Sequence, residues 1–494
     1  MSHAAGCNSV ARRRLTRCLG ASFIRTPWSF CHAIAAPRVW CGLTVAVLTG
    51  VFTSSARADP PQPDGYEGRS RLSDDDLARK RNGHYFTGLP LANYDPNTGL
   101  GAGARVYFYE NGGRDAPTFS YKPYDHRVFL QGFATTKGVQ FHWLDYDAPG
   151  VFGSLFRVRA FAIYERQNSR NYYGLGKESL RPLTFPGAGG RTFARMADYE
   201  AAELVVGQDG AASTFYDKHS FERPVVSLAL ERSLFGGLSR AFVGVSASHA
   251  KVGDWTGELV RAETADGQET RAPEAPTRLH LDCARGVVVG CRGGWDNTIR
   301  LAVSLDTRDY EPDPNSGVFV DAVTDVGTRV VGSQFGYVRE TLAARVYWSP
   351  FPRLADVVVA GRAAALVQSK GTPFFLMDIF PFTEDTRAGL GGVRTLRGFA
   401  QDRFVGHVMT MANLELRWTF AGTRLAGQRF DFGVVPFVDV GRPFDAVREA
   451  SLRGWRRGQG LGARIAWNLA TILMVDYAVS DEGTALYINF NHMF

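Results

Sequence analysis

Segments of strand length in which apolar and polar residues alternate recur along this chain, and they constrain its fold more than any other feature. In 298–306 the apolar positions are every second residue, namely Ile299, Leu301, Val303 and Leu305. The segment 408–420 repeats the pattern, with Leu414, Leu416, Trp418 and Phe420 on one face and Asn413, Glu415 and Arg417 on the other. Alternate side chains of a strand point to opposite faces of its sheet. The pattern therefore predicts strands with one apolar and one polar face.

Sixteen candidate strands of this kind, separated by turns, lie in the part of the chain after residue 84. They are 100–110, 125–136, 138–146, 154–165, 196–207, 219–233, 238–252, 297–307, 317–330, 335–349, 355–367, 406–420, 430–442, 457–469, 471–480 and 484–494. An even strand number near sixteen is typical of bacterial outer-membrane barrels.

The first 58 residues have the composition of a secretory signal. They contain seven arginines and no acidic residue, an apolar run from Trp40 to Phe52, and the small-x-small sequence Ala56-Arg57-Ala58 before Asp59. A membrane anchor helix, the alternative, would require ~18 consecutive apolar residues, which this run does not reach. We therefore expect residues 1–58 to be a signal peptide that exports the chain.

The end of the chain fits the same interpretation. Leu486, Ile488, Phe490, His492 and Phe494 alternate on one face, and a final aromatic after alternating apolar positions is similar to the signal that marks outer-membrane barrels for assembly. We take Phe490 and Phe494 as this C-terminal signature, from which His492 departs. Lipid tolerates only helices or closed sheets, because every backbone group must be paired internally. The expected fold class is all-β: a closed antiparallel transmembrane β-barrel of about 16 strands.

Two motifs specify the barrel further. They are Thr395-Leu396-Arg397-Gly398-Phe399 and, further along, Phe437-Val438-Asp439-Val440-Gly441. Together they resemble the two signature motifs of the BamA/TamA family of outer-membrane assembly barrels, the bacterial surface antigen type. In that family the loop arginine enters the barrel and pairs with the aspartate on its inner wall.

The resemblance implies a loop of about 368–405 folded into the lumen, with Arg397 paired to Asp439. A buried guanidinium needs such a partner, and arginine matches a carboxylate with two parallel bonds. Gly398 would allow the sharp turn, Phe399 would pack inside, and Phe437 and Gly441 would share the inner face with Asp439. The alternative is a solvated arginine in an external loop.

Two cysteines, Cys283 and Cys291, remain after the expected cleavage. In an exported protein such a pair most simply forms one disulfide. A metal site would need more ligands, and His280 is the nearest histidine. We therefore expect no metal and no cofactor.

The expected domains are the signal peptide 1–58, a short periplasmic segment 59–83 and the barrel 84–494. The segment 59–83 is too short for a domain, whereas assembly members of the family carry periplasmic POTRA domains. We therefore expect a family member without POTRA domains. Any client would then be recognised by the barrel or delivered by a periplasmic partner.

Charge and motif searches exclude several function classes. The net charge of +7 comes from the leader, since the remaining chain has 49 basic and 49 acidic residues, so nucleic acid is not an expected partner. No metalloprotease, nucleophile-elbow, phosphate-loop or dinucleotide motif occurs. His142 has no identifiable serine partner, which argues against a membrane lipase, and we expect no enzyme activity.

Two hypotheses remain. The first, which the resemblance implies, is a barrel in the Gram-negative outer membrane, surrounded by its lipid, that translocates or inserts protein or lipid, with a polypeptide client. The second is a passive pore or a surface binding barrel whose loops 253–296 and 368–405 meet an external partner.

Overall fold

The structure is a computed structural model. It describes residues 81–494 except for a few short stretches, which are 96–97, 116–118, 120–123, 152–153, 155, 310–313, 352–355, 384–385, 426–427, 468–470 and 491. The expected signal peptide and residues 59–80 lie outside the described residues.

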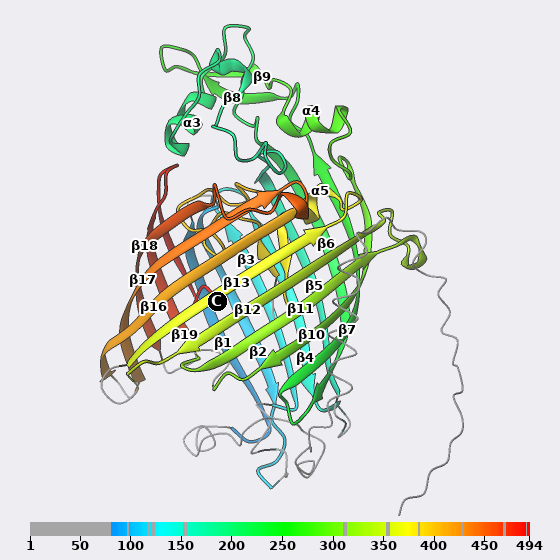
Figure 1. Ribbon diagram of the computed structural model, residues 1–494, viewed down its shortest axis with the longest axis vertical. Coiled ribbons are helices and arrows are strands. Elements are labelled where there is room, and N and C mark those ends of the chain that lie inside the picture. Colours follow the sequence, from blue (N-terminus) through cyan, green and yellow to red (C-terminus); the bar gives the residue numbers. More distant parts are fainter. Residues whose placement is uncertain are drawn as a thin grey trace, which may run out of the picture. The chain divides into compact units, whose positions relative to one another are not determined.

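Sixteen antiparallel strands close into one barrel, as the sequence predicted (Figure 1). In order around the barrel they are β1 (His84–Asp95), β2 (Gly99–Glu110), β3 (His126–Thr135), β4 (Gln140–Pro149), β5 (Phe156–Asn171), β6 (Lys218–Leu234), β7 (Ser239–Gly253), β10 (Gly293–Asp306), β11 (Gly317–Gly327), β12 (Tyr337–Trp348), β13 (Asp356–Gln368), β16 (Val408–Leu425), β17 (Gln428–Phe444), β18 (Arg456–Trp467), β19 (Thr471–Val479) and β20 (Thr484–Phe490). Closure leaves the strand edges paired along most of the wall, as lipid requires.

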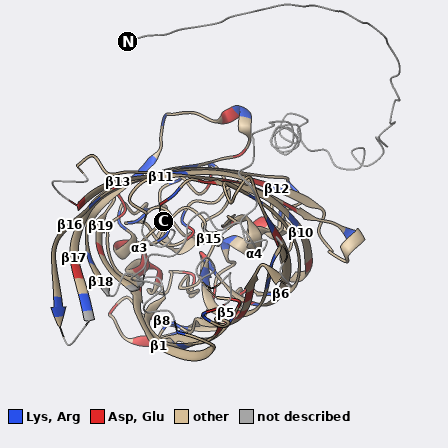
Figure 2. Ribbon diagram, turned by 90° about the horizontal axis from the view of Figure 1, so that it is seen from below, with Lys and Arg blue, Asp and Glu red and all other residues tan. Residues whose placement is uncertain are grey.

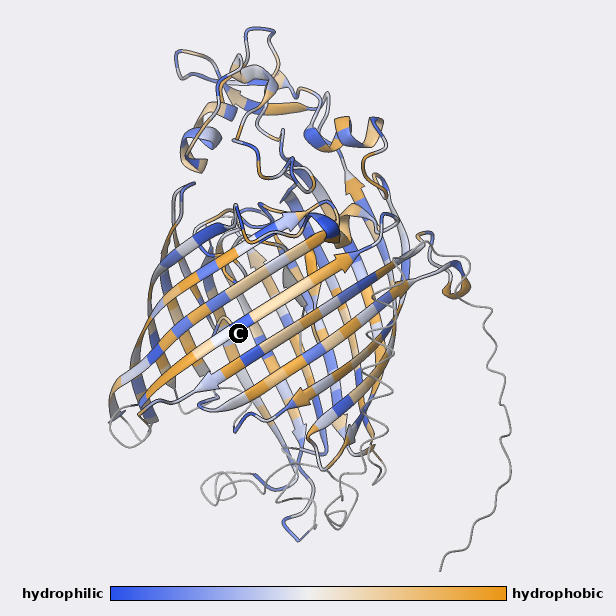
Figure 3. Ribbon diagram, viewed as in Figure 1, coloured by the Kyte–Doolittle hydropathy of each residue, from blue (hydrophilic) through white to orange (hydrophobic). Residues whose placement is uncertain are grey.

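The predicted alternation is confirmed along these strands. Figure 3 shows hydrophobic and hydrophilic residues alternating along them. In β16 the outward side chains Leu414 and Trp418 are 54% and 48% exposed, whereas the inward Arg417 is 5% exposed. The apolar face thus meets the hydrocarbon zone, and the polar side chains pair with one another inside.

One predicted strand was wrong and one strand was not predicted, so the total number of strands is the same. Residues 196–207, predicted as a strand, instead form the helix α3 (Met196–Glu203) in a long connection. This segment is rich in alanine and glutamate, which favour helices. Strand β1 was missed because its inward Leu89 and Leu91 are as apolar as its outward residues, which hides the alternation.

A folded cap stands over one end of the barrel, built from the connections 172–217 and 254–292 (Figure 1). It contains η3 (Pro186–Ala188), α3, the hairpin of β8 (Leu259–Glu263) and β9 (Glu269–Pro273), and α4 (Arg278–Ala284). The two connections are joined by backbone hydrogen bonds, since Val206 N donates to Glu263 O at 2.8 Å and Ala212 N to Pro273 O at 2.9 Å. Outer-membrane barrels have their longer loops outside the cell, so we assign the cap to the outer face. Short 3₁₀ turns, η4 (Arg329–Val331) and η5 (Val447–Glu449), lie in other connections.

No helix in the described part of the chain has the length and apolar character needed to cross a membrane.

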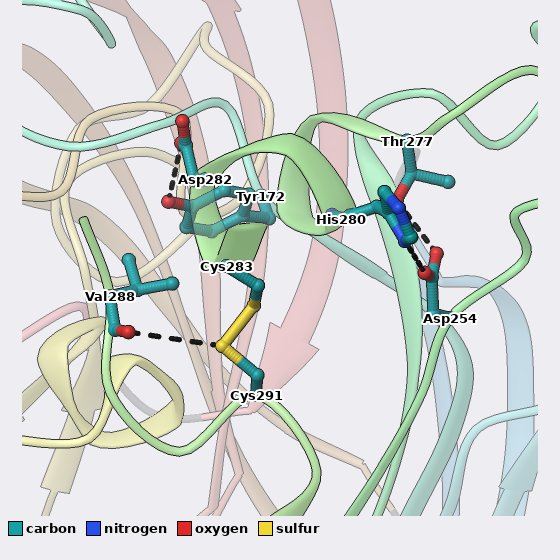
Figure 4. The surroundings of a disulfide bond; sticks show 8 residues. All are labelled: Tyr172, Asp254, Thr277, His280, Asp282, Cys283, Val288 and Cys291. Carbon is teal, nitrogen blue, oxygen red and sulfur yellow. Dashed lines mark hydrogen bonds and ion pairs between the residues drawn. A yellow bond between two sulfur atoms is a disulfide. The ribbon is translucent and has the colours of Figure 1, made fainter. Parts of the chain in front are cut away.

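Cys283 in α4 is joined by a disulfide to Cys291, just before β10 (Figure 4). The bond ties the last turn of α4 to the start of that strand. Thr277 caps the helix by accepting from His280 N at 3.1 Å, and His280 contacts Asp254 at 2.8 Å. The disulfide and these contacts fasten the cap to the rim of the wall.

The connection between β13 and β16, residues 369–407, folds into the barrel, and we call it the plug. It carries α5 (Phe374–Met377), β14 (Ile379–Pro381) and β15 (Thr386–Ala388). Figure 2, which looks along the barrel, shows β15 within the ring of strands. Leu390, Leu396, Phe399 and Phe404 of the plug are buried in an apolar core that also contains residues of the wall, such as Leu366 and Met411.

The wall is weakly joined where β1 meets β20, and we call this junction the seam. Among the described residues, the two strands pair at Tyr94↔Ile488, whereas β19 and β20 pair from Leu473↔Phe490 to Val479↔Thr484. Among the described residues, the junction of β1 with β20 thus contributes one pair to the ladder, against seven between β19 and β20.

The C-terminal signature does not lie as predicted. Leu486 is exposed on the outer face, but Phe494 is buried, and Figure 2 shows the C-terminus within the ring of strands. Phe494 is buried in the lumen against Tyr347 and Val358. Arg417 of the inner wall donates to Phe494 O at 2.7 Å, and this hydrogen bond holds the C-terminal residue in the lumen. The side chain of Phe490 lies outside those described.

Candidate functional site

The tip of the plug is shaped by glycines. Gly391 and Gly398 have φ values of 121° and 93°, which side-chain-bearing residues rarely adopt. A Cβ at Gly391 would lie 2.0 Å from Ala400 O, so the two arms of the tip touch at that point. These turns present the Arg397 side chain to the inner wall.

Arg397 binds three carboxylates. Its Nε and Nη2 donate to the two oxygens of Asp439 at 2.7 and 3.0 Å, which is the two-bond geometry expected from the motifs. Its Nη1 donates to Glu415 at 3.0 Å and to Asp476 at 2.7 Å. All four side chains are 0% exposed. One guanidinium therefore ties the plug to β16, β17 and β19 at once.

The surplus negative charge is balanced by two further arginines. Arg417 lies 3.0 Å from Glu415, and Arg464 pairs with Asp476. Three cations thus face three anions, and we call these six residues the clamp. Buried charges cost several kcal/mol each unless they are paired, and each charge of the clamp has a partner of opposite sign.

The other residues of the two motifs surround the clamp. The guanidinium of Arg397 lies 3.4 Å from the centre of the Phe437 ring, a cation–π arrangement. Gly398 N donates to Tyr487 Oη at 3.2 Å, and Gly441 lies against Leu390 of the plug. Phe399 packs on Phe404 with ring centres 5.1 Å apart, in the plug core.

Sequence reasoning placed Asn413, Glu415 and Arg417 on one face of a strand without assigning them to this site, and it missed Asp476, Arg464 and Gly458. Asn413 donates to Thr395 O at 2.7 Å and to Asp439 at 2.9 Å, bridging plug and wall. A Cβ at Gly458 would lie 1.8 Å from Arg397 O, so only glycine leaves room for the plug. The available signal was a charged, amide or glycine residue at an inward position of a strand near the C-terminus.

The plug is also anchored to the barrel at places other than the clamp. Arg170 of β5 pairs with Asp378 at 2.7 Å, and Arg403 pairs with Glu482 at 2.8 Å. Gln368 donates to Met377 O at 2.9 Å. The plug is therefore fixed to opposite sides of the barrel.

Comparison with known families gives two matches. Residues 66–125 match a domain of unknown function (DUF5982), and residues 213–491, more than half of the chain, match the Omp85 superfamily domain. The chain belongs to the Omp85 superfamily. The matched Omp85 region contains the plug, the clamp and both motifs. Membership and the closed barrel together identify an outer-membrane protein.

Solved structures similar to this Omp85 barrel include a BamA from Haemophilus ducreyi lacking POTRA domains 1–3, with 12% identity, a TM-score of 0.47, and coverage of 83% of this chain and 70% of that one. CdiB from Acinetobacter baumannii has 12% identity and a TM-score of 0.41, covering 83% and 59%. CdiB from Escherichia coli has 10% identity and a TM-score of 0.48, covering 82% and 62%. This chain thus spans less than two thirds of either CdiB chain. No curated protein matches it.

Proposed function

We propose that this barrel inserts or translocates polypeptide at the outer membrane and that the seam is the place where a client strand joins it. The observation that carries the proposal is the short junction of β1 with β20, which pair at Tyr94↔Ile488 among the described residues. An open strand edge offers a row of backbone donors and acceptors to an added strand.

In this proposal the clamp has a holding role. Arg397 keeps the plug inside the lumen, so that the seam can open without making a wide aqueous channel. Because the clamp joins β16, β17 and β19, it also stiffens the wall next to the seam. A passive pore would require no open strand edge. A plug anchored in the lumen also argues against a passive pore.

The test is to lock the seam. Tyr94→Cys and Ile488→Cys on facing positions would be oxidised to a disulfide in the full-length protein in liposomes. A urea-unfolded eight-stranded barrel is then added, and its folding is followed on a gel. We expect the locked protein to lose acceleration of folding and to regain it on reduction.

The matched control carries Val106→Cys and Leu130→Cys, an outward pair between the fully paired strands β2 and β3. It should fold the client equally well oxidised or reduced. Equal activity of the locked seam would contradict the proposal. Solute leakage that does not depend on the seam or on a client would favour a passive pore instead.

A further inference from the structure

An aromatic ring lies flat on the inner wall at strands β2 and β3. It belongs to Phe133 of β3 and lies across the backbone of β2, where Gly101 and Gly103 leave room for it. A Cβ at Gly101 would lie 2.2 Å from Cζ of this ring, and a Cβ at Gly103 would lie 3.0 Å from its Cδ2. The two glycines are two residues apart and therefore share the inward face of β2. The half-buried ring thus has one face against the wall and the other toward the lumen.

Phe133 borders a cavity of about 850 Å³ between this wall and the plug, which we call the chamber. The plug contributes Val393, Arg394 and Gln401 to its lining. The other rings that line it are those of Tyr107, Tyr109 and Phe141. A cavity of this size with aromatic walls and convergent polar groups has the features of a ligand site.

Amide side chains are the second element of the lining. They are those of Asn93, Gln131, Gln401 and Asn489. An amide can both donate and accept hydrogen bonds, so it can bind a hydroxyl group in either direction. A hydrocarbon chain would leave these groups without new partners and displace water from them, which is unfavourable. The lining therefore suits a ligand that has apolar ring faces and hydroxyl groups around its edge.

Arg105 of β2 adds a positive charge to the chamber. Its Nε donates to Gln131 Oε1 and its Nη1 to Tyr107 Oη, both at 2.9 Å, and both acceptors are neutral. Among the residues that the structure describes, no carboxylate forms an ion pair with Arg105, whereas Arg127 on the next strand pairs with Asp145 at 2.8 Å. The guanidinium is therefore available to an anionic group of a ligand.

We propose that the chamber binds an acidic saccharide, that is, a sugar chain carrying a carboxylate or a phosphate. The C–H face of a sugar ring would pack on the open face of Phe133, and the amides would bind its hydroxyl groups. The anionic group would accept hydrogen bonds from Arg105. The inference goes beyond the proposed function and does not rest on it, because it holds whether or not a client strand enters at the seam.

The test measures sugar binding to the full-length protein in nanodiscs by saturation-transfer difference NMR, with empty nanodiscs subtracted. The probes are a galacturonic acid trimer, a mannose trimer with a terminal phosphate, uncharged maltotriose and a cationic glucosamine trimer. We expect at least one acidic trimer to bind saturably and about ten-fold more tightly than maltotriose, because it gains a charged hydrogen bond. The glucosamine trimer should bind more weakly than maltotriose. Comparing the two acidic trimers distinguishes a carboxylate from a phosphate as the recognised group.

Two variants separate the charge from the ring. Arg105→Gln removes the charge but retains a donor, so it should weaken binding of the acidic trimer about ten-fold and leave maltotriose binding unchanged. Phe133→Ala removes the stacking surface and should weaken binding of both sugars about ten-fold. Arg105→Lys keeps the charge and should retain the preference for the acidic trimer.

The matched controls are Arg429→Gln, which removes a positive charge from a pair outside the chamber, and Leu130→Ala, on the outward face of β3. Both should bind the trimers like the wild type, and heat-shifted gel migration checks that every variant is folded. Absence of saturable binding, equal binding of the acidic and glucosamine trimers, or equal effects of Phe133→Ala and Leu130→Ala would overturn the inference.

Discussion

Removing the Arg397 side chain should be among the most damaging single changes in this barrel. In Arg397→Ala the clamp retains Asp439, Glu415 and Asp476 but only two arginines, which strands one negative charge at a place where these side chains are 0% exposed. Breaking a buried ion pair by removing one partner costs on the order of 3–5 kcal/mol. The plug also loses its attachment to three strands.

The companion variants test the charge argument. Asp439→Ala should also cost on the order of 3–5 kcal/mol, because it leaves three arginines with two carboxylates and removes both side-chain hydrogen bonds from Arg397 to Asp439. The double variant leaves two cations and two anions, which again balance. The free energy of unfolding lost in the double variant should therefore be smaller than the sum of the two single losses, by about 1–3 kcal/mol. Arg397→Lys should rescue poorly, because an ammonium lacks the planar fork that reaches several carboxylates.

The assay is the temperature at which the folded, faster-migrating band disappears on a gel, measured for the wild type and each variant. The matched control is Arg429→Ala, whose side chain is 52% exposed in its pair with Asp431 and should contribute little. Strict additivity in the cycle, or an Arg397→Ala shift no larger than that of the control, would refute the reasoning.

Three further predictions concern the cap and the space for the plug. Burial raises the pKa of Glu203 in α3 to about 8, so its contribution to cap stability is fully present below the unfolded pKa of about 4.5 and is lost as the pH rises through about 8. Hydrogen exchange of α3, corrected for intrinsic rates, should therefore quicken between pH 6 and 9 in the wild type but not in Glu203→Gln. Replacing Cys283 and Cys291 by serine should loosen the cap by about 2–3 kcal/mol through the lost loop constraint, and unchanged proteolysis of the cap would argue against this. Gly458→Ala should lower the gel-shift temperature because a Cβ there would meet the plug backbone at 1.8 Å, whereas Gly361→Ala, with nothing within 4 Å, should not.

The sequence by itself determined the barrel and the direction of most of its side chains. Alternation is a local property of the sequence. In a closed wall surrounded by lipid, a strand with one apolar face must point that face outward. The alternation around Leu414 therefore identified both the outward and the inward row of β16. The motifs around Arg397 and Asp439 implied a contact between a loop and the wall that the structure contains.

Local reasoning failed where the environment is not the one that alternation assumes. Strand β1 has leucines on its inner face because it borders a cavity of the lumen instead of an ion-pair network, so its sequence lacks the alternation of apolar and polar residues that identifies a strand. The stretch around Tyr199 contains enough apolar residues for a strand, but it belongs to the cap, where helix-forming residues pack on a small separate core.

Tertiary structure alone decided which carboxylates meet Arg397. Glu415 and Asp476 are 61 residues apart in sequence and stand on β16 and β19. They come within reach of one guanidinium only because the wall curves and the plug descends between them. The inward turn of Phe494 has the same origin, since Arg417 and the apolar pocket beside it are assembled only once the barrel closes. Such contacts depend on the curvature of the wall and on the path of the plug. Neither can be predicted from the alternation of residues within a single strand.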